Sequence, residues 1–141
     1  MADITLLKRG RATTLNIKVK PAVTDNAGVV TNPYTKDFSS NYTATMIIRR
    51  KAGNSYNGPL IDTLTSANSG TGANRITFPS LTGAETTENN VVVKWLTADA
   101  DALPNESTTV YGDLKIKNTA TNPDSIEHSS RFTFEIVPEI I

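Results

Sequence analysis

Several stretches of the chain alternate apolar and polar side chains with a period of two residues, which is the pattern of a β-strand with one buried face. In the first stretch, Leu15, Ile17 and Val19 are separated by polar side chains, and Pro21 ends the stretch. The other predicted strands are residues 42–48, 60–64, 75–78, 91–96, 108–117 and 132–136. The spacing of these stretches predicts about eight strands separated by turns.

Turn-forming residues lie between the apolar stretches. Asp25-Asn26-Ala27-Gly28 predicts a turn or an edge excursion, and residues 66–74 are rich enough in Gly, Ser, Asn and Thr to predict a loop. The one helix candidate is the short segment 97–103, before Pro104. Residues 91–96 are apolar on both faces, so this strand is expected to be covered on both sides or buried at a subunit contact.

This pattern predicts an all-β protein, an immunoglobulin-like Greek-key β-sandwich of about eight strands. Residues 1–141 are expected to form a single sandwich domain, with short arms at residues 1–11 and 137–141. The expected core consists of Leu15, Ile17, Val19, Met46, Ile48, Val93, Leu114, Ile116, Phe132 and Phe134.

The composition agrees with this fold class and narrows the chemistry. The chain has 21 Thr, 13 Asn and 10 Ser among 141 residues, which favours strands and turns over helical bundles. It has no cysteine, so it can form no disulfide, thiolate metal site or thiol nucleophile.

The net charge is +0, which removes the usual electrostatic basis for binding nucleic acid. Residues 1–51 nevertheless carry nine basic and three acidic side chains, a formal charge of +6, so residues 52–141 carry −6. Two interpretations are open. The halves can interleave as a mixed solvated surface, or they can form patches of opposite sign for subunit contact.

The candidate chemical groups all have plainer structural interpretations. The single His128 is predicted to lie in a turn, and the Asp99 and Asp101 carboxylates to cap a helical turn. Gly70-Thr71-Gly72 lacks the Lys of a phosphate loop, Arg49-Arg50-Lys51 lacks interleaved aromatics, and Trp95 is expected in the core or at an interface. We therefore expect no enzyme, no cofactor, no metal and no small-molecule substrate.

Tyr111 is a candidate for a tyrosine corner, because an acidic connection precedes its strand. Its hydroxyl is expected to donate a hydrogen bond to the backbone of residues 99–103.

Both ends of the chain carry aliphatic side chains, although chain ends are usually polar. Ile4, Leu6 and Leu7 precede a basic group, and the chain ends in Ile140 and Ile141. We expect both ends to dock on neighbouring subunits in a contact that salt weakens, with folding back onto their own sandwich as the alternative. The expected interface comprises Ile4, Leu6, Leu7, Lys8, Arg9, Arg11, Ile140 and Ile141.

Taken in order, the strand motifs resemble a β-sandwich module of virion proteins from tailed bacteriophages, such as the N-terminal part of baseplate upper proteins. Most of the chain carries the resemblance. Gly112, inserted between Tyr111 and Asp113, departs from the module. The matching motifs are residues 10–20, Asp37-Phe38, Tyr42-Thr43-Ala44-Thr45-Met46-Ile47-Ile48-Arg49, Val91-Val92-Val93-Lys94-Trp95-Leu96 with Thr97-Ala98-Asp99, Tyr111-Gly112-Asp113-Leu114-Lys115-Ile116 and Phe132-Thr133-Phe134-Glu135-Ile136.

The resemblance implies a virion structural protein that acts by protein–protein contact in the tail, baseplate or fibre attachment. Its partners would be other virion proteins and further copies of itself. A capsid decoration protein is the first alternative, and a cell-surface adhesin or carbohydrate-binding sandwich is the second. No export signal and no apolar run of membrane-spanning length is evident, so we expect synthesis in a host cytoplasm, a place in the virion and no contact with a membrane.

Overall fold

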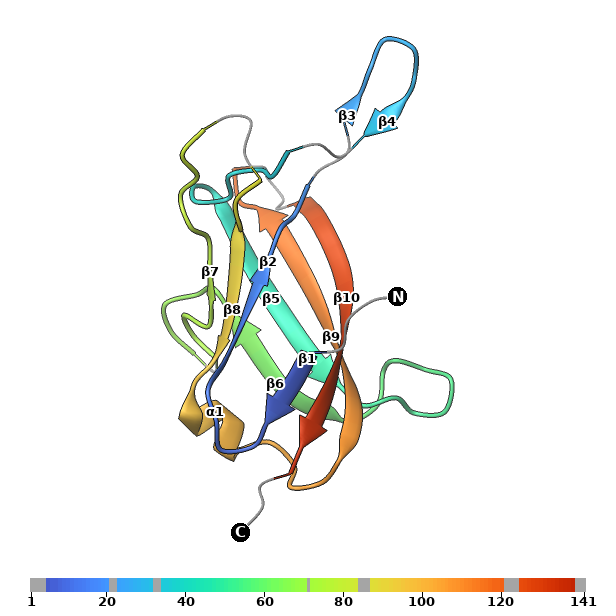
Figure 1. Ribbon diagram of the computed structural model, residues 1–141, viewed down its shortest axis with the longest axis vertical. Coiled ribbons are helices and arrows are strands. Elements are labelled where there is room, and N and C mark those ends of the chain that lie inside the picture. Colours follow the sequence, from blue (N-terminus) through green and yellow to red (C-terminus); the bar gives the residue numbers. More distant parts are fainter. Residues whose placement is uncertain are drawn as a thin grey trace.

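The computed structural model describes residues 5–20, 23–31, 34–70, 72–83, 87–120 and 125–138. They form two stacked β-sheets, one short helix and a projecting hairpin (Figure 1). The larger sheet has the order β1-β10-β9-β5-β6 and the smaller sheet the order β2-β8-β7. The strands of the larger sheet are β1 (Thr5–Lys8), β10 (Ser125–Val137), β9 (Thr108–Asn118), β5 (Tyr42–Arg49) and β6 (Leu60–Thr65). Those of the smaller sheet are β2 (Thr13–Ile17), β8 (Val91–Trp95) and β7 (Ile76–Thr77).

Strands that lie side by side are often far apart in the sequence. β5 pairs with β9, and β2 pairs with β8, in antiparallel registers. β1 runs parallel to β10, with Thr5 opposite Phe134 and Lys8 opposite Val137. This connectivity is that of an immunoglobulin-like sandwich, so the predicted fold class is confirmed. The eight strands of the two sheets also match the predicted number.

Side chains from the inner faces of both sheets form one core. In β5 the inward positions are Ala44, Met46 and Ile48, and in β9 they include Leu114 and Ile116. Of the predicted core residues, all are buried except Leu15 and Phe132, which are partly buried against the core. The two-residue alternation therefore identified the inner faces correctly.

Gly112 occupies an inward position at the centre of the larger sheet. A Cβ atom built there would lie 2.6 Å from Cε2 of Phe134 and 3.1 Å from Sδ of Met46. Trp95 packs edge-on against the Phe134 ring, with centroids 5.3 Å apart, and is buried as the core prediction required. The missing side chain at Gly112 thus leaves room for the large aromatic groups.

β8 is buried on one face only within the single chain, so the expectation that residues 91–96 are covered on both sides is wrong, whereas burial at a subunit contact stays a prediction. Val91, Val93 and Trp95 are buried, whereas Lys94 and Leu96 are exposed. The apolar run misled because Val92 lies half-buried on the outer face of the smaller sheet.

The short helix α1 (Thr97–Asp101) follows β8, close to the predicted segment. The Leu96 backbone N–H donates to the Asp99 carboxylate, at 2.8 Å, so the predicted cap is confirmed for Asp99, whereas Asp101 is the last residue of the helix. None of the described helical structure is long and apolar enough to cross a membrane.

Candidate functional site

The groups considered for catalysis are not brought together. Within the described ranges, no three His, Asp or Glu side chains are placed to hold a metal ion. His128 lies inside β10, just after a β-bulge, so its assignment to a turn was wrong. Burial lowers its pKa, and its ring nitrogen hydrogen-bonds the Ser130 hydroxyl.

A second polar cluster joins β7 to α1. The Arg75 guanidinium donates to Asp99 through Nε at 2.6 Å and through Nη2 at 3.3 Å. Burial raises the pKa of the nearby Asp62 carboxyl. The 66–74 loop is attached to β6 because the Thr65 N–H donates to the Gly72 carbonyl. The first contact therefore links the start of β7 to α1, and the second holds the loop against β6.

Tyr111 lies on the outer face of the larger sheet, so the tyrosine-corner prediction is wrong. Its neighbours Val110 and Gly112 take the buried positions, and strand alternation turns the Tyr111 ring outward. The ring packs edge-on against Tyr56, at 4.8 Å between centroids. The Leu103 carbonyl at the expected corner instead accepts a hydrogen bond from Nε of Arg9, at 3.0 Å.

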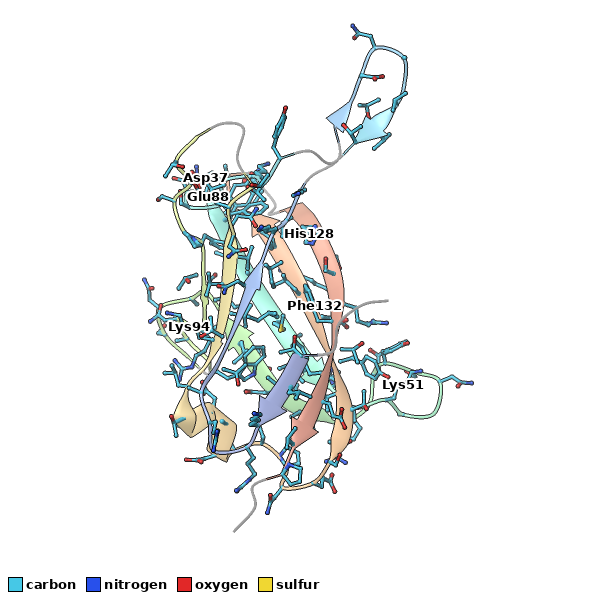
Figure 2. The ribbon with its side chains drawn as sticks, in the orientation of Figure 1. Asp37, Lys51, Glu88, Lys94, His128 and Phe132 are labelled. Atoms are coloured by element: carbon cyan, nitrogen blue, oxygen red, sulfur yellow. The ribbon has the colours of Figure 1, made fainter. Side chains whose placement is uncertain are left out.

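The Tyr56 ring is held between two cations. Cζ of Arg131 lies 3.9 Å from its centroid and Nζ of Lys51 lies 4.6 Å from it. Arg131 also pairs with Asp113 through a forked contact, at 2.7 and 3.2 Å. Figure 2 shows Lys51 on the loop that projects beside this sheet. These contacts attach the loop between β5 and β6 to the outer face.

An ion pair connects the basic and acidic parts of the chain within one molecule. Arg50, from the basic part, pairs with Glu106. This contact agrees with the interpretation of the surface as mixed charge.

The N-terminal segment does not form a free arm from Thr5 to Lys8, because these residues are strand β1. Leu7 is buried in the protein's own core, so its assignment to a docking surface was wrong. The parallel pairing with β10 places Leu6 beside Glu135 on the opposite face, where Leu6 is exposed. Lys8 and Arg11 are exposed too, and Arg9 is partly buried. Ile4, Ile140 and Ile141 lie outside the described residues.

The most prominent exposed element is a hairpin between β2 and β5, which we call the arm. It consists of β3 (Val23–Thr24) and β4 (Val30–Thr31), paired antiparallel. The Asp25 carboxylate accepts hydrogen bonds from the N–H groups of Ala27 and Val29, both at 2.9 Å, and shapes the turn. In Figure 1 the arm extends beyond one end of the sandwich, and Figure 2 shows its side chains in open space.

The arm exposes apolar side chains. Val29 is 54% exposed and Val30 is 58% exposed, and the nearby Tyr34 is exposed as well. Two adjacent valines on a projecting hairpin gain nothing from their own core, but they would bury apolar surface against a partner.

A buried asparagine fixes both legs of the arm. Asn90, which is 0% exposed, accepts from the Val19 N–H at 2.7 Å through Oδ1. Its Nδ2 donates to the carbonyls of Val19 and Lys36, at 2.8 and 2.7 Å. The Lys36 N–H also donates to the Val19 carbonyl, at 3.3 Å. The chain therefore leaves the sandwich after Val19 and returns to it at Lys36, and Asn90 holds these two positions together.

The sequence predicted the turn of the arm but not its exposed apolar side chains. The pair Val29-Val30 directly after a turn signal was the available sign, since a hairpin tip is usually polar. Asn90 carries no local signal, because its partners lie 71 and 54 residues away.

Comparisons with known proteins assign the chain to no family. No protein-family model matches the chain, and no curated protein matches it either. A solved structure that aligns with it is the NK cell receptor Nkp44, described as a triggering partner in natural cytotoxicity. The alignment covers 96% of this chain and 99% of the receptor chain, with 13% identity and a TM-score of 0.41.

Proposed function

We propose that the protein is a structural component of a bacteriophage virion that acts by protein–protein contact in the tail, baseplate or fibre attachment. The arm is the observation that carries the contact role. Asn90 fixes the backbone at the base of the arm, and the arm exposes Val29 and Val30. An apolar surface that is held in place before binding loses little conformational entropy when a partner covers it. The virion setting is supported by the resemblance of the strand motifs to phage sandwich modules.

The outer face of the larger sheet offers no open aromatic platform for a sugar at Tyr56. Sugar platforms need an open aromatic face, but the Tyr56 ring has Arg131 at 3.9 Å and Lys51 at 4.6 Å. Capsid decoration remains the alternative within the same class, because it would use the same kind of contact.

The test is incorporation into particles of the phage whose genome encodes the chain. Val30→Lys should fold normally, since Val30 is exposed, yet should be depleted from purified particles. Leu60→Lys is the matched control, because Leu60 is 55% exposed on β6. Cryo-electron microscopy of the particles would then assign the protein to the tail or to the capsid surface. Absence of the unmodified protein from particles would refute the virion role.

A further inference from the structure

The edge of β10 offers a place where a strand can be added. On one side β10 pairs with β9 along its length. On the other side β1 pairs only with residues 134–137. Among the described residues, no strand covers the stretch from Ile126 to Thr133 on that side. This stretch therefore presents backbone N–H and C=O groups at a sheet edge.

The open stretch has a recognisable surface. Ile126 is 56% exposed, and Lys117 lies opposite it on β9. Lys115 lies opposite Ser129 on β9, while Arg131 within the stretch is paired with Asp113 and the stretch also contains Glu127. The edge thus combines an exposed apolar side chain with two lysines on the adjacent strand.

The arm has the complementary features. It is a short two-stranded ribbon with exposed Val29 and Val30, and its one charged side chain is the acidic Asp25. Figure 2 labels His128 toward the end of the sandwich from which the arm projects. Arm and open edge are thus near the same end of each molecule.

We infer that the arm of one copy adds to the open edge of β10 in a second copy. Backbone hydrogen bonds would join a two-residue strand of the arm to part of the 126–133 stretch, and one of the two exposed valines would bury against Ile126. β1 already uses the remaining part of the same edge in this way. This inference rests on the proposed contact function and names its partner as a further copy of the chain.

The contact is heterologous, because arm and edge are different surfaces. Repeating it therefore builds a ring or an open chain of copies. A few residues of added strand bury less than the ~1,200 Å² typical of stable complexes, so a single contact is weak. Several contacts around a ring or on a particle raise the effective affinity.

Cross-linking tests the pairing directly, because the chain has no native cysteine. Val30→Cys protein is mixed with Ile126→Cys protein and treated with a short bis-maleimide, which tolerates a shift of register. The control mixture pairs Val30→Cys with Leu60→Cys, whose side chain is equally exposed on β6. Thermal unfolding of each variant checks that the fold is retained.

We expect the arm-plus-edge mixture to give about tenfold more heterodimer than the control mixture. Equal yields, or a predominance of Val30→Cys homodimers, would overturn the inference. If the cross-link fails while Val30→Lys still loses incorporation, the arm binds another virion protein, and only the self-contact is refuted. If the cross-link forms but the protein is absent from particles, only the virion role is refuted.

Discussion

Replacing Asn90 by alanine should both destabilise the protein and loosen the arm. The change removes three hydrogen bonds, one from the Val19 N–H and two to the carbonyls of Val19 and Lys36. Val19 is itself buried, so its N–H loses a partner where water does not replace it. One stranded group and a small cavity together cost about 2–4 kcal/mol, a large share of the 5–15 kcal/mol of a typical domain.

Denaturant unfolding measures this loss, and amide hydrogen exchange at Val19 shows whether the clamp has opened. Asn89→Ala, the same change at a half-buried position one residue earlier, is the control. Asn90→Asp keeps the acceptor for Val19 but turns an oxygen toward the two carbonyls. That variant should be unstable at neutral pH and recover in acid as the carboxyl gains a proton. A loss below about 1 kcal/mol for Asn90→Ala would refute the clamp.

Three further changes test the core, the buried charge and the outer face. Gly112→Ala should destabilise by about 1–3 kcal/mol in urea unfolding, because the new methyl group meets Phe134 at 2.6 Å. Asp62→Asn should stabilise the protein at pH 7, because burial raises the Asp62 pKa above 3.8 and penalises the charged form. The difference in unfolding free energy between the two proteins should vanish below pH 3.8, where the Asp62 carboxyl is protonated in both the folded and the unfolded state. A difference that persists in acid would contradict the explanation by buried charge. Tyr111→Phe should leave the melting temperature nearly unchanged, whereas Tyr111→Ala should lose the aromatic contact with Tyr56, about 0.5–1.5 kcal/mol beyond burial.

The fold was predictable wherever a strand carries its own alternation. In β5 and β9, every second side chain is apolar, and those side chains form the core. Tyr111 shows the limit of this reasoning. A motif suggested an inward role, but Gly112 occupies the inward position and only the register of the whole strand decides which side chain faces out.

Long-range partners explain the other differences. β1 is four residues long and lies in the N-terminal segment that the sequence predicts to dock on a neighbouring subunit. The sequence does not reveal its pairing, because its partner β10 begins more than a hundred residues later. The role of Asn90 depends on contacts with Val19 and Lys36, which lie 71 and 54 residues away in the sequence. Deleting residues 1–9 should destabilise the domain, because the deletion removes Leu7, which is part of the core.

An open sheet edge such as that of β10 can pair nonspecifically with strands of other proteins unless something prevents it. Exposed edges invite aggregation, and proteins protect them with bulges and with charged side chains. β10 has both, a bulge between Ile126 and His128 and the charged Arg131 near the middle of the open stretch. A long, regular strand cannot keep its register past the bulge, whereas a short ribbon can pair on one side of it. The same features that discourage nonspecific pairing therefore select a partner of the arm's length, so the edge can remain exposed in a free copy and still accept the arm of another.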